Sequence, residues 1–373
     1  MNIDKSIDFL LENAGPVIQY RLRKEILKNL STAEEENLLE RIYQTAHFKL
    51  VQSYVKPSGY IGCGFHSWDN WRGAALHETP LQDGETAARL LSYYAVPKNH
   101  PIVAGFVAAM RDEDTLRDEF SYIPPEIQRF NVRYSGLNNG FGLMAWMYTI
   151  QAMLGYGDDF EDIKGYQQAA LRGFERAVSI TSIMEIAKTP TAKGKTDCPY
   201  IEENEYFPCA YTLAALAYAK GWRTPKNLKM LAESINNISE NMKRDENLYV
   251  RVNGRYYAQG WSVFNRLRAF KTDLIDSIMY RRPLTEIAML GVGERVGVIQ
   301  ESAANIEEAL SGDGILKLRF DLPHNRRYSP KKIEYPTAYS DVRTESDYNS
   351  EIPLLCDLTF WAVQFLSLVE ESS

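Results

Sequence analysis

The sequence contains little cysteine, no CxxC pair and no long uncharged apolar run. Its four cysteines lie far apart along the 373 residues, at Cys63, Cys198, Cys209 and Cys356. This spacing argues against a dithiol redox motif and a cysteine-rich zinc module, and it favours reduced, mostly buried thiols. A membrane-spanning helix needs roughly 20 uncharged apolar residues. Since no stretch approaches that composition, we expect no integral membrane segment.

A concentrated basic face is also missing. The net charge is −7 at pH 7, and lysines and arginines alternate with acids along the chain. A nucleic-acid-binding protein gathers positive charge on one face, so we expect no nucleic-acid partner. The N-terminal stretch MNIDKSIDFLLENAG lacks the basic start, long apolar region and cleavage site of a secretory signal. We therefore expect a cytoplasmic protein.

What the sequence does contain is a series of apolar segments with helical spacing. Residues 6–27 show this spacing on both sides of Gly15-Pro16, and a proline suits the first turn of a helix, so a helical hairpin is predicted. A third helix is predicted over residues 31–55, because it opens with a Ser/Thr cap and acids in its first turn. Pro57-Ser58-Gly59 ends this N-terminal helical segment, residues 1–57.

A loose repeat of helical hairpins follows. Its three units are residues 84–110, 140–178 and 205–238, with breaks at Val96-Pro97, Gly155-Tyr156-Gly157 and Gly221. In each unit an almost wholly apolar helix comes first and an amphipathic, charged helix comes second. A helix that is apolar on all sides must be surrounded by protein, whereas a helix with a charged stripe can face water. The pattern therefore predicts alternating inner and outer helices.

Closing these hairpins into a ring would bury the inner helices and protect both ends of the series. The apolar segment 352–369 is predicted to seal the ring against the first hairpins. Residues 247–260 alternate in polarity around Asn253-Gly254, a hairpin signal, and residues 313–323 are typical of a short strand. The sequence thus predicts an all-α protein, an α/α toroid of inner and outer helices with small β-ribbon decorations. No linker-like tract is present, so we predict a single toroid domain over residues 1–373, with the N-terminal helical segment packed on the ring.

These hairpins, and helix starts such as LQDGETAARLL (residues 81–91), resemble the α/α toroid superfamily of squalene and other terpene cyclases and protein prenyltransferase β subunits. The resemblance is closest to bacterial prenyltransferase-like, or squalene-cyclase-like, proteins of the cytoplasm. It covers roughly residues 55–370 as architecture, with degenerate local motifs. It implies a central cavity enclosed by the inner helices, with functional residues near inner-helix starts and in the connecting loops. A shared fold does not by itself confer a shared function.

The catalytic motifs of this superfamily are matched only in part. Triterpene cyclases protonate an alkene with a DxDD motif, and the nearest match, RDEDT at residues 111–115, lacks its spacing and its double Asp. DDFED at residues 158–162 matches the magnesium-binding DDxxD motif, but its place directly after a glycine-rich break favours helix capping. The Asp-Cys and Cys-Asp pairs at residues 197–198 and 356–357 lack the zinc-ligand spacing of prenyltransferase β subunits. We assign no metal ligand, the sequence leaves open whether a zinc or magnesium ion is bound, and it identifies no cofactor.

Polar and aromatic residues gather before each of four apolar helices, where a toroid would bring them to one end. There, Trp and Tyr faces would hold an apolar or sugar ligand while a His or carboxylate transfers a proton. The predicted catalytic residues are Asp83, Glu202, Glu205 and Asp357. The predicted substrate-binding residues are His66, Trp68, Trp71, His77, Tyr134, Asn138, Trp146, Tyr206, Tyr335 and Tyr339. In the alternative interpretation the acids cap helices or form a solvated cluster, and the aromatic residues cover seams between helices.

One function and two rivals follow from these expectations. In the leading hypothesis a terpenoid-cyclase-like or prenyltransferase-like toroid binds an apolar or isoprenoid small molecule in a central pocket and transforms it by general acid catalysis. The first rival is a carbohydrate-active α/α-barrel lyase or hydrolase, which requires carboxylates or a His/Tyr pair facing each other across the pocket. The second is a non-catalytic toroid that binds a ligand or a protein. The sequence leaves open whether the protein is an enzyme.

Overall fold

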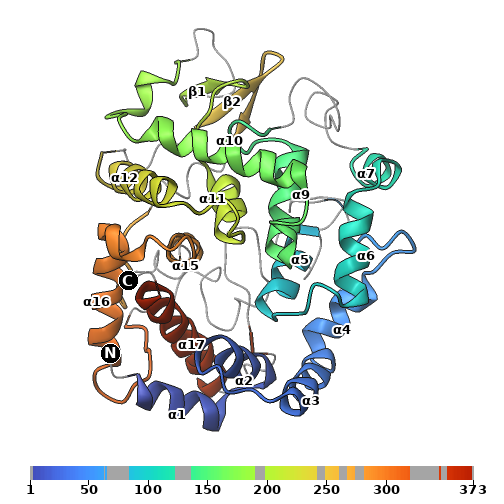
Figure 1. The fold of residues 1–373 in the computed structure, drawn as a ribbon, viewed down its shortest axis with the longest axis vertical. Helices are drawn as coiled ribbons and strands as arrows, with labels where there is room; N and C mark the ends of the chain where they lie inside the picture. The colour runs from blue at the N-terminus through green and yellow to red at the C-terminus, as the bar shows by residue number, and fades with distance from the viewer. Residues whose placement is uncertain are drawn as a thin grey trace. The chain divides into compact units, whose positions relative to one another are not determined.

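The computed structural model describes residues 3–62, 64, 84–121, 136–189, 198–241, 248–259, 267–273, 281–319, 344–345 and 351–371. The chain is mostly helical with few strands, which confirms the all-α prediction (Figure 1). It divides into two compact units. The described residues of unit 1 lie within 1–111, 270–282 and 301–371, and those of unit 2 lie within 112–269 and 283–300. The prediction of a single toroid domain stays a prediction.

Unit 1 begins with the predicted helical hairpin. Its elements are α1 (Asp4–Asn13), α2 (Pro16–Arg21), the π-helical turn η1 (Leu22–Ile26), α3 (Thr32–Tyr43) and α4 (Ala46–Ser53). Ser31 and Glu34 form a capping box at the start of α3, as the sequence indicates. The helix predicted over residues 31–55 is in fact two helices. Thr45 caps the second, where its Oγ1 accepts a hydrogen bond from the Phe48 backbone N at 3.3 Å.

The core of unit 1 is built around α5 (Gly84–Tyr93) and α17 (Glu351–Glu370), with α6 (Pro101–Met110) following α5. Every residue of α5 from 84 to 91 is buried, including the charged Glu85 and Arg89, so α5 is surrounded by protein although it is not apolar on all sides. In Figure 1, α17 lies beside α1 and α2, which it contacts. The shared cluster contains Leu10, Ile18, Leu22, Cys356, Phe360 and Val363. The two ends of the chain therefore belong to one core.

Unit 2 contains the second and third predicted hairpins. Its helices are α7 (Glu113–Glu119), α9 (Leu143–Gln151), the π-helical turn η2 (Ala152–Tyr156), α10 (Glu161–Ala177), the 3-10 turn η3 (Ile183–Glu185), α11 (Ala210–Ala217) and α12 (Pro225–Asn241). Further along the chain are α15 (Arg281–Met289), the 3-10 turn η4 (Gly293–Arg295) and α16 (Gly297–Leu310). The division between the two units falls within α15, after Arg282, and within α16, after Gln300. Gly155, with φ of 89°, makes the break between α9 and α10. The amphipathic α10 contacts α9, α11 and α12.

The first and second helices of these hairpins differ in how much of their surface is buried, as the sequence predicts. In α11 every residue except Tyr211 is buried, whereas the buried residues of α12 form one stripe from Leu231 to Ile238. The first hairpin departs from the pattern, because its second helix α6 carries no charged residue. Closure of the hairpins into a ring stays a prediction.

A small three-stranded sheet decorates unit 2. β1 (Tyr200–Glu202) pairs in parallel with β2 (Tyr249–Val252), and β2 pairs antiparallel with β3 (Arg255–Ala258). Asn253 (φ 48°) and Gly254 (φ 79°) both adopt the left-handed conformation of the turn, which confirms the predicted hairpin. The strand predicted over residues 313–323 is not found in its described part, since residues 313–319 form turns and irregular backbone.

Within the described residues, one helix is long and apolar enough to cross a membrane, namely α17, and half of its apolar window is buried inside the protein. Such a helix is equally typical of a protein core. The contacts of α17 with α1 and α2 place it in the core of unit 1.

Candidate functional site

The residues that the sequence predicts for a site fall into three groups in the structure. Asn138, Trp146, Glu202, Glu205 and Tyr206 belong to unit 2, and Asp357 belongs to unit 1. The remaining predicted residues lie outside the described part of the chain: His66, Trp68, Trp71, His77, Asp83, Tyr134, Tyr335 and Tyr339.

In unit 2 the structure brings the glycine-rich turn before α9 together with the acidic segment before α11. Asn138 Nδ2 donates to the Asn204 carbonyl at 2.9 Å, and the Asn138 carbonyl accepts from the Phe207 backbone N at 3.1 Å. Next to it, the fully buried Asn139 donates to the carbonyls of Glu203 and Glu205 at 3.3 and 3.2 Å. Two predicted groups that lie over 60 residues apart in the sequence are therefore neighbours.

The carboxylates of this group already have cationic partners. Glu202 accepts hydrogen bonds from Lys188 Nζ at 2.9 Å and from Arg251 Nη2 at 2.6 Å. Burial by itself would raise the pKa of Glu202, but these hydrogen bonds and charges outweigh it, and the pKa is lowered. Glu205 forms an ion pair with Arg176 at 3.1 Å. A lowered pKa is opposite to what a general acid needs at neutral pH, so Glu202 fits the role of an ion-paired structural carboxylate.

The aromatic residues of this group pack within the protein or against an exposed cation. Trp146 is only 4% exposed, and its ring lies 5.8 Å from Phe141 and 6.0 Å from Tyr211 between centroids. The Tyr206 hydroxyl accepts a hydrogen bond from Arg172 at 3.3 Å, and the guanidinium lies 5.7 Å from the ring centroid. Trp146 therefore contributes to the core of unit 2.

In unit 1 the predicted residue Asp357 lies near the start of α17 with a carboxylate that is only partly satisfied. The Thr344 backbone N donates to Asp357 Oδ1 at 3.0 Å, and the Thr344 hydroxyl also donates to this oxygen. The residue as a whole keeps some solvent exposure, but its Oδ2 atom is buried and has no hydrogen-bond partner. Burial raises the pKa of Asp357 to about 6, against the opposing effects of the Thr344 hydrogen bonds and the charge of Arg281.

A second buried acid, Glu345, lies next to Asp357. Its Oε1 accepts a 2.6 Å hydrogen bond from the backbone N of Gly15, the residue that begins α2. The pKa of Glu345 is raised to about 7. Burial is the main cause and the negative charge of Asp357 adds to it, whereas the hydrogen bond from Gly15 acts in the opposite direction. The neighbouring Cys356 is also affected, since burial and the charge of Glu345 raise the pKa of its thiol to about 12. Cys356 is therefore a neutral thiol at physiological pH.

The local sequence explains why a carboxylate from residue 345 reaches residue 15. The start of a helix leaves backbone N–H groups without intrahelical acceptors and carries a partial positive charge. Pro16 has no N–H to donate, and the Gly15 N–H is one of the remaining donors, which Glu345 satisfies. Gly15 also leaves space for the acid, because a Cβ there would come within 2.5 Å of Glu345 Oε2.

A third group, Arg281, completes the surroundings of Asp357. Its guanidinium lies over the Trp361 ring, 5.2 Å from the centroid, and its positive charge acts on the Asp357 carboxylate. Carboxyls with pKa values near neutrality can donate or accept a proton, as general acid–base catalysis requires. Metal binding is a separate question. Among the described residues, no group of three or more His, Cys, Asp or Glu side chains is placed to hold a metal ion.

Sequence reasoning found Asp357 but missed its partners Glu345 and Arg281. The only signal for Glu345 was its position in the long polar stretch before the last apolar helix, since a long loop within a compact chain is more often functional than idle. No protein-family model, curated protein or solved structure matches the chain. The candidate site therefore rests on its own geometry.

Proposed function

We propose that the chain is an enzyme of the α/α-toroid, terpenoid-cyclase-like or prenyltransferase-like kind that acts in the cytoplasm on an apolar or isoprenoid small molecule by general acid–base catalysis. In this proposal Asp357 and Glu345 are the acid pair. The observation that supports it is the pair itself: two adjacent buried carboxyls in unit 1, one with an oxygen that lacks a hydrogen-bond partner.

The acidity of this pair restricts the reaction. With a pKa of about 7, Glu345 keeps a substantial protonated fraction near neutral pH, whereas Asp357, with a pKa of about 6, is largely ionised. Either carboxyl is a far weaker acid than protonation of an isolated alkene demands. It is well matched to protonation of an oxygen leaving group, followed by return of a proton to the conjugate carboxylate. We therefore propose chemistry at an oxygen-bearing carbon, with Glu345 as the proton donor at pH 7 and Asp357 largely ionised.

The carbohydrate-active rival draws support from the same pair, because glycosidases also use two carboxyl groups. Incubation of the protein with isoprenoid alcohols, isoprenoid diphosphates and oligosaccharides, analysed by mass spectrometry, separates the two. Conversion of an isoprenoid compound supports the proposal, conversion of an oligosaccharide supports the rival, and binding without turnover supports the non-catalytic toroid.

Variants connect any turnover to the acid pair. We expect Glu345→Gln and Asp357→Asn each to lower the rate by about 100-fold or more, the usual contribution of a general acid or base. Glu370→Gln is the matched control, because it makes the same chemical change at the exposed end of α17 and should leave the rate unchanged. Full activity in both acid-pair variants would show that the chemistry takes place elsewhere.

A further inference from the structure

A pocket of about 550 Å³ lies in unit 1 between the end of α1, α2 with the turn η1, and one face of α3. In Figure 1, α2 lies beside α3, which it contacts. The apolar lining includes Leu38, which is 6% exposed, and Leu11, which is 40% exposed. Ligand pockets in proteins usually measure roughly 300–1,000 Å³. The size of the pocket therefore suits a small organic molecule with an apolar part.

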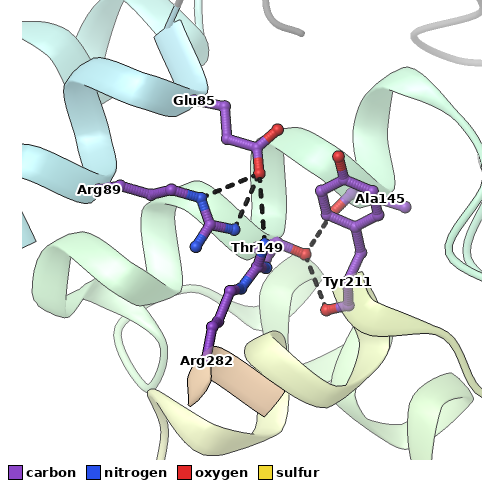
Figure 2. A network of polar contacts seen from close by, with 6 residues as sticks. All are labelled: Glu85, Arg89, Ala145, Thr149, Tyr211 and Arg282. Carbon is purple, nitrogen blue, oxygen red and sulfur yellow. Dashed lines mark hydrogen bonds and ion pairs between the residues drawn. The ribbon is translucent and has the colours of Figure 1, made fainter. Parts of the chain in front are cut away.

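One pair of charges in the pocket wall is already satisfied. Arg23 Nη2 pairs with Glu34 Oε1 at 2.7 Å, and the other oxygen of Glu34 accepts a hydrogen bond from the Ser31 backbone N at 3.0 Å. A similar pair lies in the core of unit 1, where Arg89 donates to Glu85 Oε1 at 2.8 Å, and Figure 2 shows the two side chains pointing toward each other. An arginine and a carboxylate paired in this way largely satisfy each other, so we assign no ligand to either pair.

Two further charges in the pocket wall have no partner in the part of the chain that the structure describes. Glu12 lies in the last turn of α1 and Arg41 in the last turn of α3, and both residues are exposed. Although they line the same pocket, they form no ion pair with each other. The pocket wall thus presents one anionic and one cationic group, together with apolar surface, to a molecule that enters it.

The position of Glu12 is unfavourable for α1 taken alone. The C-terminal end of a helix carries a partial negative charge, which favours cations and disfavours acids there. The last turn of α1 contains no basic residue. Gln19 Nε2 donates to the carbonyls of Leu10 and Leu11 at 3.0 and 2.7 Å, but its amide is neutral and brings no charge. A cationic group of a ligand beside Glu12 would therefore be stabilised by both the carboxylate and the helix end.

We propose that this pocket binds a small zwitterionic molecule of about the size of a dipeptide, with its ammonium group at Glu12 and its carboxylate at Arg41. The apolar side chains of the ligand pack against Leu11 and Leu38. The Arg41 guanidinium presents a planar fork that matches a carboxylate, and Asn37, one turn earlier on the same face of α3, adds an amide donor. The lining residues do not include the acid pair, so this inference does not rest on the proposed reaction.

The dipeptide leucyl-leucine is the probe, because it carries both charges and two apolar side chains. Its N-acetyl derivative lacks the ammonium group, and its C-terminal amide lacks the carboxylate. Isothermal titration calorimetry on the full-length protein at low ionic strength measures the dissociation constant of each. We expect saturable binding of leucyl-leucine and binding weaker by roughly two- to fivefold for each derivative, as the loss of one exposed ion pair predicts. Absence of saturable binding of leucyl-leucine, or equal affinity for all three compounds, would overturn the proposal.

Substitutions assign each charge of the ligand to its partner. Glu12→Gln removes the partner of the ammonium group, so this variant should bind leucyl-leucine and its N-acetyl derivative equally and still discriminate against the amide. Arg41→Gln should show the reverse, with equal affinity for the dipeptide and its amide. The matched controls are Glu40→Gln and Lys49→Gln, which make similar changes at exposed residues that do not line the pocket and should leave all affinities unchanged.

Each variant is compared across the three compounds, so a change in stability that affects all of them equally does not imitate the expected result. Discrimination that persists in both Glu12→Gln and Arg41→Gln would place the dipeptide elsewhere and overturn the proposal. Loss of discrimination in the control variants as well would show that net charge, and not the pocket, determines binding, and would also overturn it. Since no turnover is measured, failure of the proposed function leaves this result unaffected.

Discussion

Glu345 and Asp357 are carboxyl groups that the fold shields from water, and within the part of the chain that the structure describes neither has a direct ion-pair partner. Desolvation favours their protonated forms, and the negative charge of Asp357 also favours the protonated form of Glu345. The folded protein therefore binds protons more tightly at these positions than the unfolded chain does. Stability conferred in this way is complete below the ordinary pKa and is lost as the pH rises through the raised one. Selection for stability alone does not favour such a pair, which is why it indicates function.

The pH dependence of Glu345→Gln tests this account at the level of one side chain. The pKa of Glu345 lies at about 7 in the folded protein against an ordinary value of 4.5, so wild-type stability should fall relative to the variant between pH 4.5 and pH 7. From pH 4 to pH 8 we expect the difference in unfolding free energy to change by roughly 2–3 kcal/mol in favour of the variant. Chemical denaturation at several pH values measures it. Parallel curves would contradict the raised pKa.

Local patterns in the sequence predicted the elements whose formation depends on neighbouring residues. The break at Gly15-Pro16, the Ser/Thr cap before α3 and the Asn253-Gly254 hairpin all follow from such signals and are confirmed. β1 could not be foreseen in this way, because its strand character depends on parallel pairing with β2, a partner about 50 residues later. The contact of Glu345 with Gly15 joins residues 330 apart in the sequence, and a local sequence pattern does not indicate a contact over that separation.

A substitution at Gly15, in the junction between α1 and α2, tests how these elements position Glu345. In Gly15→Ala the new Cβ would meet Glu345 Oε2 at 2.5 Å, so the acid must move and we expect a loss of about 1–3 kcal/mol in stability. If this clash is the cause, Glu345→Ala should remove most of the penalty, and a double-mutant cycle should show strong coupling. Gly165→Ala in α10 is the control, because its Cβ meets nothing within 4 Å and a helical alanine should be neutral or stabilising. Additive effects of the first two substitutions would separate Gly15 from the acid.

At the scale of the whole molecule, each compact unit is assembled from segments that are distant in the sequence. Unit 1 combines the first 111 residues with the C-terminal helix, and the candidate acid pair lies where these segments meet. The sequence suggested that the last apolar helix packs on the first hairpin, and contacts of α17 with α1 and α2 bear this out. Ring closure depends on relations among many distant helices, which hairpin periodicity alone does not determine.

The role of α17 as a core helix makes a prediction that distinguishes it from a membrane span. Leu10 of α1 is fully buried in the cluster with Phe360 and Val363, whereas the adjacent Leu11 is 40% exposed. If α17 fills the core of unit 1, Leu10→Ala should cost about 2–5 kcal/mol, because it leaves a cavity, and Leu11→Ala should cost well under 1 kcal/mol. Chemical unfolding of the two variants in aqueous buffer measures this difference. If α17 instead left the protein for a bilayer, Leu10 would lose its partners and the two substitutions would have similar, small effects. Asp357 of the acid pair lies on this helix, so a core role for α17 is also what holds Asp357 beside Glu345.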